Sequence, residues 1–363
     1  MKIISFYLPQ FHVIPENNEW WGNGFTEWVN TKKAKPLFEG HSQPKEPYND
    51  NYYNLADAST LEWQVKLAKE YGLYGFCFYH YWFKGKLLLE KPILNYVQHK
   101  NIDFPFCTAW ANEPWTRSWD GKSKEILMPQ DYGDQSDWEE HFIYLLQLFK
   151  DERYIKVENK PLFIIYRPSS IEQCTDMLSY WNRRAVECGF KGIYFIEMLT
   201  SFDNRFVEGF NASIQFEPMY TIKHHIPKQE FIKRGARKVA RNLLKKGSIE
   251  KVPRTLLDTI NYDVVWQSIL NRETIKRREK DFLGAFVNWD NTARKGNEGL
   301  ILQDFTVEKF ENYLSKQAKK SRELNNDFLF INAWNEWAEG TYLEPDKKNG
   351  FRYLEALHAA TKK

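Results

Sequence analysis

The chain has 363 residues, of which 42% are hydrophobic, 27% are charged and 17% are aromatic. This length can bury a sizeable core, and the balance is typical of soluble globular proteins rather than of disordered or membrane-spanning chains. The net charge of +3 excludes a nucleic-acid interface spread over the whole chain. The aromatic share, with 14 Trp, 20 Tyr and 26 Phe, is typical of carbohydrate sites as well as of packed cores.

The chain begins with an apolar, strand-like run at residues 2–8. This run leaves no room for the apolar core and cleavage site of a signal peptide, so we expect a cytoplasmic protein. The cysteines show neither metal-ligand spacing nor a disulfide framework, and reduced thiols are expected in that compartment. They are Cys77, Cys107, Cys174 and Cys188.

Short apolar runs alternate with longer amphipathic segments along the chain, which is typical of parallel strands joined by crossover helices. The predicted strands are residues 2–8, 74–82, 104–110, 161–167, 192–199, 212–217, 282–289 and 327–334. The predicted helices include residues 60–71, 138–150, 171–188 and 307–319, and a closing helix from about residue 350. Eight such units predict an α/β fold, a (β/α)8 TIM barrel in a single domain, with long loops on its catalytic face.

Polar and aromatic residues gather where the predicted strands end, as a barrel with its site on that face requires. Each of them alone could cap the following helix, so their recurrence is the stronger evidence. The candidate substrate-binding residues at strand ends are Tyr7, Gln10, His12, His80, Tyr81, Trp110, Asn112, Glu113, Tyr166, Arg167, Glu217, Asn288, Asp290, Trp334 and Asn335.

A long connection follows the first predicted strand, at residues 12–58. Its segment 19–28 is rich in tryptophan and glycine and ends at Trp28, a further candidate substrate-binding residue. Long loops are usually either functional or disordered, and this density of aromatic rings argues against disorder. We expect the loop to roof a sugar site.

A second long connection, at about residues 220–260, is a basic helical insertion. Within its segment 231–246, Ile232, Val239 and Leu243 can share one helical face, while lysines and arginines fill the rest. One interpretation is a solvated helix packed on the barrel. The other is an interfacial helix near anionic lipid or a lipid-linked phosphate, which would make the protein peripheral to the inner membrane.

The last predicted strand leads directly into two glutamates, Glu336 and Glu339, each beside a tryptophan. In glycoside hydrolysis one carboxyl donates a proton to the glycosidic oxygen, while a second, ionised carboxylate helps to form the new bond at the anomeric carbon. The indoles of Trp334 and Trp337 could stack on a sugar ring, and apolar surroundings raise a carboxyl pKa toward the range that a general acid needs. We therefore expect the pair to be catalytic rather than solvated loop residues.

Several common catalytic machineries are absent from the sequence. It has no Walker loop, no GxGxxG opening a helix after a strand, no HExxH, no GxSxG and no Asp-x-Asp. His224 and His225 adjoin, but adjacent side chains diverge, so they do not predict a metal site. We expect no metal, no cofactor and no nucleic-acid partner.

Five motifs spread over nearly the whole chain resemble the WbsX family. They are FYLPQFH at residues 6–12, the loop at 19–28, GFCFYHYWF at 75–83, WANEPWTR at 110–117 and NAWNEWAEGT at 332–341. Members of that family sit among O-antigen and capsule biosynthesis proteins and are presumed glycosyltransferases. Their fold is similar to that of glycoside hydrolase family 99, the (β/α)8 endo-acting α-mannosidases and mannanases.

In that hydrolase family the motif Glu-Trp-x-Glu-Gly supplies both catalytic carboxylates, and it aligns on Glu336 and Glu339. The resemblance implies that Glu336 takes the proton of the sugar's own 2-hydroxyl, so that O2 attacks the anomeric carbon and a 1,2-anhydro sugar forms. It implies that Glu339 protonates the leaving oxygen and then activates water, which gives net retention.

We therefore expect residues 1–363 to form one metal-independent catalytic domain, a retaining glycoside hydrolase or transglycosylase of bacterial surface polysaccharide metabolism. Its partner would be an oligosaccharide or a lipid-linked glycan. A glycosyltransferase is the alternative, for which Arg117, Arg167 and segment 231–246 could hold a phosphate. A third possibility is a catalytically inactive glycan-binding protein, which would not need both glutamates.

Overall fold

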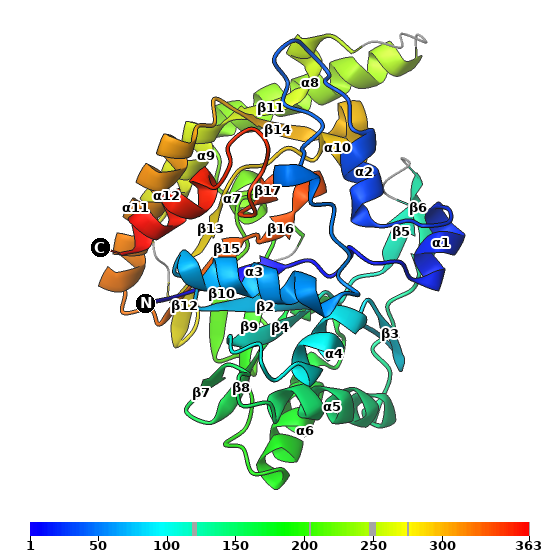
Figure 1. The fold of residues 1–363 in the computed structure, drawn as a ribbon, viewed down its shortest axis with the longest axis vertical. Helices are drawn as coiled ribbons and strands as arrows, with labels where there is room; N and C mark the ends of the chain where they lie inside the picture. Colours follow the sequence, from blue (N-terminus) through cyan, green and yellow to red (C-terminus); the bar gives the residue numbers. More distant parts are fainter. Residues whose placement is uncertain (118–121, 203–204, 247–251, 274–275, 363) are drawn as a thin grey trace.

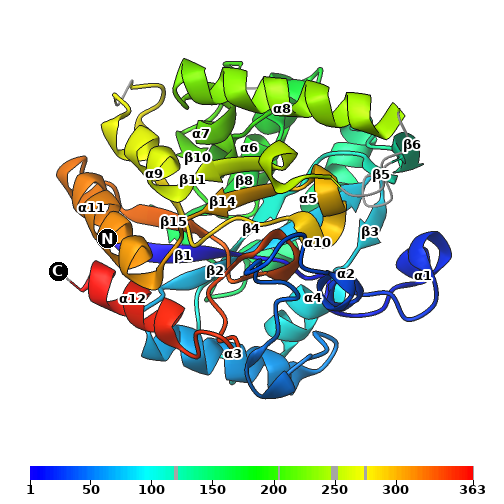
Figure 2. The same cartoon turned by 90° about the horizontal axis from the view of Figure 1, so that it is seen from above.

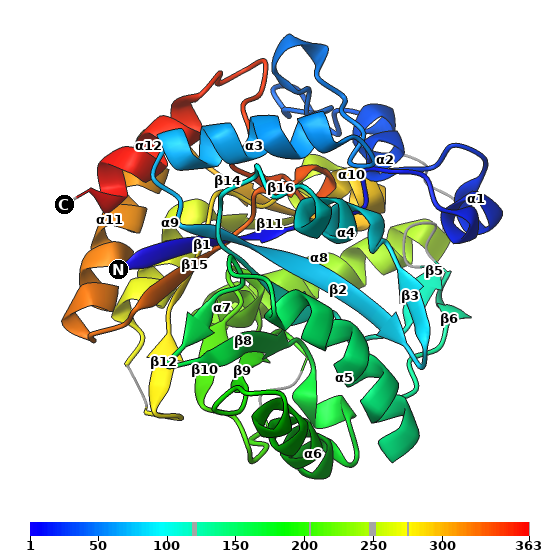
Figure 3. The same cartoon turned by 60° about the horizontal axis from the view of Figure 1, so that its bottom comes forward.

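The computed structural model describes residues 1–117, 122–202, 205–246, 252–273 and 276–362. Parallel strands form a barrel at the centre of the molecule, and helices surround it (Figures 1 and 3). In hydrogen-bonding order the strands of this sheet run β12-β10-β9-β8-β4-β2-β1-β15-β13. Their bounds are β1 Lys2–Tyr7, β2 Gly75–Phe83, β4 Phe106–Trp110, β8 Lys160–Ile165, β9 Tyr194–Leu199, β10 Ala212–Gln215, β12 Lys280–Phe282, β13 Gly284–Phe286 and β15 Phe328–Asn332.

A single segment closes the barrel. Strands β12 and β13 are separated only by Leu283, and β12 pairs in parallel with β10 while β13 pairs in parallel with β15. Glycine is required at position 284, because a Cβ there would overlap the carbonyl oxygen of Gln215. The predicted (β/α)8 barrel is therefore confirmed, with the seventh strand divided into two short parts.

The outer layer consists of helices that bury one apolar side against the strands. Helix α5 begins with a capping box, in which the Asp134 carboxylate accepts from Ser136 N and the Asp137 carboxylate accepts from Asp134 N. The helices of this layer are α3 Ala58–Glu70, α4 Lys91–Gln98, α5 Gln135–Phe149, α6 Cys174–Glu187, α7 Met219–His224, α9 Tyr262–Asn271, α11 Val307–Glu323 and α12 Arg352–Thr361.

The two long connections carry helices of their own. The loop after β1 holds α1 Pro15–Trp21, α2 Glu27–Lys33 and η1 Tyr48–Asp50, and the insertion after β10 holds α8 Lys228–Lys246 and η4 Arg254–Leu256. None of the described helices has both the length and the apolar content to cross a bilayer. The remaining elements are β3 Lys86–Leu88, β5 Trp115–Arg117, β6 Lys122–Met128, β7 Lys156–Val157, η3 Pro168–Ser170, β11 Asp258–Asn261, α10 Thr292–Lys295, η5 Gly296–Glu298, β14 Leu300–Gln303, β16 Asn335–Glu336, η6 Trp337–Glu339 and β17 Thr341–Tyr342.

Most aromatic side chains pack in the hydrophobic core. Phe6 of β1 lies inside the barrel against Phe330 of β15, with ring centroids 5.8 Å apart. Cys77 and Cys107 face each other on neighbouring strands as buried free thiols, and the other two cysteines are also free, as expected. The high aromatic content therefore reflects the core first, and the site uses only a part of it.

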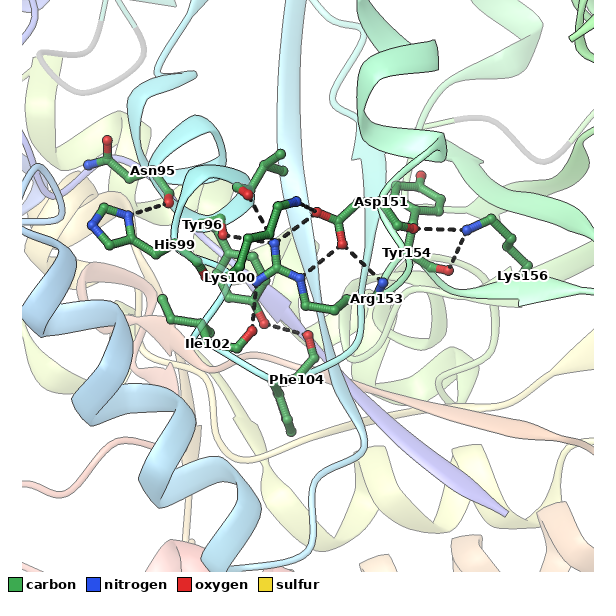
Figure 4. Close-up of polar contacts among 11 residues, drawn as sticks. Asn95, Tyr96, His99, Lys100, Ile102, Phe104, Asp151, Arg153, Tyr154 and Lys156 are labelled. Atoms are coloured by element: carbon green, nitrogen blue, oxygen red, sulfur yellow. Dashed lines mark hydrogen bonds and ion pairs between the residues drawn. The ribbon is translucent and has the colours of Figure 1, made fainter.

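A buried ion pair organises the end of the barrel where the strands begin (Figure 4). Arg153 donates to both carboxylate oxygens of Asp151 and to the carbonyls of residues 96, 97, 99 and 102 at and just beyond the end of α4. Both loops precede barrel strands, so this cluster lies on the face of a (β/α)8 barrel that serves stability rather than catalysis.

Candidate active site

The predicted catalytic pair lies beyond the carboxyl end of β15, in a short segment fixed on both sides. Leu8 N donates to Asn335 Oδ1 (2.8 Å), and Asn335 Nδ2 donates to Leu8 O (3.0 Å). After the pair, Gly340 has φ of +66°, and a Cβ there would lie 2.9 Å from the backbone nitrogen of Asp290, so only glycine fits. Asp290 N donates to the carbonyl oxygen of Glu339 at 2.7 Å.

One arginine contacts both glutamates. Arg294 Nη1 lies 2.6 Å from Glu339 Oε1, and Nη2 lies 3.0 Å from Glu336 Oε2. The third guanidinium nitrogen, Nε, lies 2.9 Å from Oε1 of Glu27, which is fully buried at the start of α2. Three carboxyl groups therefore surround a cation whose side chain is only 11% exposed.

Burial and charge change the pKa of Glu336 in opposite directions. Loss of solvent raises it most, Arg294 lowers it, and the neighbouring Glu339 and Glu27 raise it again, so that the pKa of Glu336 is raised to about 8. In the free protein this carboxyl group consequently holds a proton at neutral pH. Such a group can act as an acid directly, whereas it must first lose the proton to act as a base.

The two glutamates line a cavity of about 480 Å³. Aromatic rings stack well on sugar faces, and polar side chains can bind hydroxyl groups. The aromatic lining includes Trp21, Tyr79, Tyr81, Trp115, Tyr166, Phe202, Phe216 and Trp289. The polar lining includes Gln10, Glu113, Arg167, Asn291, Arg294 and Lys295.

Five predicted substrate-binding residues line this cavity, namely Gln10, Tyr81, Glu113, Tyr166 and Arg167. Arg167 Nη1 lies 3.3 Å from Glu113 Oε2, and burial raises the pKa of Glu113 although the arginine lowers it in part. Burial and the charge of the neighbouring Glu336 raise the pKa of Tyr81 well above 10, so its phenol stays neutral and can hydrogen-bond a hydroxyl group.

Other predicted residues point away from the cavity, because successive side chains of a strand face opposite sides. In β2, Tyr79 and Tyr81 line the cavity, whereas His80 between them faces α5. There His80 Nε2 lies 2.8 Å from His141 Nε2, and burial lowers the pKa of His80 to about 3. His80 is thus a core residue of the outer layer.

The same outward orientation applies to three further aromatic residues. Tyr7 donates a hydrogen bond to Gln64 of α3 at 2.5 Å. Trp110 packs against Trp181 of α6, and Trp334 is fully buried. None of the three lines the cavity, which corrects the expectation that they would contact substrate there.

Two asparagines join the ends of neighbouring strands instead of lining the cavity. Asn112 Oδ1 accepts from Arg167 N (2.7 Å) and Asn112 Nδ2 donates to Arg167 O (2.9 Å), the same arrangement that Asn335 makes with β1. His12 and Trp28 are each hydrogen-bonded to a backbone carbonyl within the loop after β1. All four therefore shape the rim of the site through the backbone.

The last three predicted residues lie in different surroundings. Glu217 is buried and ion-paired with Arg272 at 2.9 Å. Asn288 and Asp290 line a second cavity of about 720 Å³, while Trp289 between them lines the first. The expectation that all strand-end residues share one cleft is thus corrected by the alternation of side chains along each strand.

The indoles beside the glutamates are packing residues rather than surfaces for sugar. Trp334 is 0% exposed and Trp337 is 1% exposed. Trp337 stacks on Tyr342 with ring centroids 3.9 Å apart and donates from Nε1 to Glu344 at 2.7 Å. Burial raises the pKa of Glu344 to about 7. The rings that do line the cavity come from other segments, which corrects the role expected for these two tryptophans.

Residues of the site that are not among those predicted from the sequence include Arg294, Glu27, Tyr79 and Trp115. Arg294 could have been suspected, because it follows the seventh strand closely and two carboxyls in an apolar site need a counterion. Tyr79 could have been found from the strand period, since it lies two residues before Tyr81. Nothing in the sequence pairs Glu27 with an arginine more than 260 residues away.

This arrangement, a (β/α)8 barrel whose strand ends hold two glutamates in an aromatic cavity, is that of a carbohydrate-active enzyme. The family described as glycosyltransferase WbsX matches residues 3–357, and the chain belongs to that family. Two proteins named "Uncharacterized protein WxcX", from two strains of Xanthomonas campestris pv. campestris, are 33% identical over 366 aligned residues. The match covers 99% of this chain and 49% of each relative, so the chain spans about half the length of the curated relatives it matches.

Solved structures show the same fold. A family 99 endo-α-mannosidase from Bacteroides thetaiotaomicron aligns with a TM-score of 0.58 and 12% identity, covering 99% of this chain and 95% of the other. A structure described as a glycoside hydrolase-like protein aligns with a TM-score of 0.60 and 12% identity, covering 100% of this chain and 94% of the other.

Proposed function

We propose that this protein is a retaining glycoside hydrolase or transglycosylase of bacterial surface polysaccharide metabolism, such as that of O-antigen or capsule. The observation that carries the proposal is the placement of Glu336 and Glu339 on one guanidinium group at the wall of an aromatic cavity. A structural ion pair needs only one carboxylate, whereas glycoside chemistry needs two carboxyl groups that share a single site.

The reaction begins with attack of the sugar's 2-hydroxyl oxygen on its own anomeric carbon. Glu336 takes the hydroxyl proton, Glu339 gives a proton to the leaving oxygen, and a 1,2-anhydro sugar forms. Water or an acceptor hydroxyl, activated by Glu339, then opens this ring, and Glu336 returns its proton to O2. Two inversions give net retention, without a metal or a cofactor.

The raised pKa of Glu336 makes these roles testable. At neutral pH the free protein holds a proton on Glu336, so the base is formed as the pH rises through about 8. Turnover should therefore increase between pH 6 and pH 9. A decrease in turnover over the same pH range would indicate that the roles are exchanged, with Glu336 as the acid and Glu339 as the base.

Substitution of each glutamate by glutamine tests the pair directly. Glu339→Gln should slow the turnover of ordinary glycosides by roughly 10²–10⁴ fold, because no proton reaches the leaving oxygen. It should slow the first step of an activated aryl glycoside much less, since that leaving group needs no proton. Glu336→Gln should slow both substrates. Equal losses in the two variants on both substrates would contradict separate acid and base roles.

A glycosyltransferase is the second candidate, favoured by the description of the family to which the chain belongs. Arg167 and Lys295 in the cavity lining could bind the phosphate of a nucleotide sugar or of a lipid-linked donor. A catalytically inactive glycan-binding protein is the third and would tolerate loss of either glutamate without loss of function.

We propose an oligosaccharide or a lipid-linked glycan as the substrate. A cytoplasmic protein in peripheral contact with the inner membrane through segment 231–246 would meet a lipid-linked precursor where it is made. The free thiols are consistent with that compartment.

A further inference from the structure

Helix α8 is amphipathic, but its apolar side faces solvent and its polar side faces the protein. It lies at the edge of the molecule, alongside β11 and η4 (Figures 1 and 2). A surface helix of a globular protein normally turns its apolar side inward. In α8 the inward side is polar and the outward side is apolar.

Three arginines attach α8 to the protein. Arg234 forms a two-point ion pair with Asp258, with nitrogen–oxygen distances of 2.7 and 2.8 Å. Arg237 donates to the carbonyl of Thr259 at 2.7 Å, and Arg241 donates to the carbonyl of residue 256 at 3.1 Å. These arginines recur at helical spacing on one face, so they are anchoring residues and are not available to an outside partner.

The opposite face carries large apolar side chains in solvent. Phe231 is 58% exposed, Ile232 68%, Val239 61% and Leu243 64%. At 100° per residue these four positions fall within about 120° of one another around the helix, so they form one stripe. Contiguous exposed apolar surface of this kind marks a site of interaction.

Exposed lysines accompany this stripe. Lys238 lies at one edge of the stripe by the helical period, and Lys228 stands at its amino-terminal end, whereas Lys233 lies farther round the helix and is ion-paired with Glu230 at 2.7 Å. The whole helix has eight lysines and arginines against one glutamate, Glu230. An apolar stripe bordered by lysines matches the boundary between acyl chains and anionic headgroups. A second copy of the same helix would bring lysines against lysines.

We propose that the outward stripe of α8, Phe231, Ile232, Val239 and Leu243, docks the protein on an anionic lipid bilayer. The apolar side chains enter the headgroup–acyl boundary, and the lysines bind the headgroup phosphates. The arginines hold the helix in this orientation. This inference stands independently of the chemistry proposed for the cavity, because its readout requires no substrate.

Co-sedimentation of the full chain with lipid vesicles tests the proposal. The vesicles are phosphatidylcholine alone, or phosphatidylcholine with about one third phosphatidylglycerol. The wild-type protein should bind the anionic vesicles and should bind more weakly as salt is raised. The double variant I232S/L243S should lower the partition coefficient by about tenfold or more, since two large apolar side chains no longer enter the bilayer.

A matched control is Val186→Ser, which removes an exposed apolar side chain (58%) from α6, on a different helix. It should leave vesicle binding unchanged. Lys238→Glu should weaken binding to anionic vesicles alone. Unfolding curves show whether each variant is folded, and substitutions on the solvent face should not change them.

Three results would overturn the proposal. The first is that the wild-type protein does not bind anionic vesicles. The second is that a folded I232S/L243S variant binds them as the wild type does. The third is a wild-type dimer in sedimentation velocity that I232S/L243S converts to a monomer while neither protein binds vesicles, since a second copy would then cover the stripe. Failure of the hydrolase proposal would appear only in turnover and leave vesicle binding as it is.

Discussion

Replacing Glu336 by glutamine should stabilise the protein, and only at high pH. The pKa of Glu336 is raised from the ordinary 4.5 to about 8 in the folded protein, first by burial. A carboxyl group whose pKa is higher in the folded state than in the unfolded state does not change the free energy of unfolding at a pH below both pKa values, because it is protonated in both states. As the pH rises from about 4.5 to 8 the unfolded chain ionises first, so the folded state loses stability. At 1.36 kcal/mol for each pKa unit, the penalty approaches about 5 kcal/mol at pH 8.

Glutamine keeps the shape of the side chain and cannot ionise, so Glu336→Gln removes this penalty. The gain is smaller than the full value, because the contact with Arg294 is weakened. Urea unfolding of both proteins at intervals from pH 5 to pH 9 measures the difference. It should be near zero at pH 5 and should grow to several kcal/mol by pH 8.

A matched control is Glu355→Gln, which removes an exposed carboxyl group from α12. Surface changes of this kind stay within about 0.5 kcal/mol. A stability difference for Glu336→Gln that is independent of pH, or largest at pH 5, would refute the reasoning. It would mean that Glu336 is ionised in the free protein, because Arg294 lowers the pKa of Glu336 by more than burial raises it.

Four other substitutions have distinct expected outcomes. Arg294→Met should destabilise the protein by about 3–5 kcal/mol at pH 8 and by less at pH 5, where Glu336 is protonated and needs no cation; urea unfolding measures both. Trp289→Ala and Trp334→Ala should each lower stability by about 3–5 kcal/mol, because both side chains are buried. Only Trp289→Ala should also weaken glycan binding in calorimetry, by about 1–3 kcal/mol, because Trp289 lines the cavity and Trp334 does not. Arg153→Met should cost about 1–3 kcal/mol of stability, because buried Asp151 keeps its ion pair with Lys100 but loses its hydrogen bonds from Arg153, and it should leave glycan affinity unchanged.

The fold could be predicted from local patterns because each barrel strand is a short apolar run and each outer helix has an apolar stripe. The division of the seventh strand at Leu283 could not, since it depends on which neighbours the segment meets on its two sides. The short helices in the loop after β1 could not be predicted from composition either. They are short, and helices of this length depend on contacts with the rest of the protein.

The position of Glu336 and Glu339 at the wall of the cavity could be predicted because both lie in one segment after the last strand, but which other residues line the cavity depends on register. A shift of one residue along a strand turns every side chain to the other face. This is why Tyr79 and Tyr81 line the cavity while His80 does not. The orientation of helix α8 also depends on contacts between distant segments. Its apolar stripe is visible in the sequence, but its outward orientation follows from the contact of Arg234 with Asp258, which no local pattern indicates.

Turnover with defined substrates tests the central claim most directly. The wild-type protein and the Glu336→Gln and Glu339→Gln variants are incubated with a panel of oligosaccharides and aryl glycosides, and separately with nucleotide sugars and lipid-linked sugars plus acceptors. We predict release or transfer of sugar by the wild type from a glycoside without any nucleotide, with retained anomeric configuration. The activity on oligosaccharides should be lost in both variants, whereas Glu339→Gln should slow the first step of an activated aryl glycoside much less. Consumption of a nucleotide sugar or a lipid-linked sugar in the presence of an acceptor, with nothing released from the glycan panel, would contradict it and make the protein a glycosyltransferase.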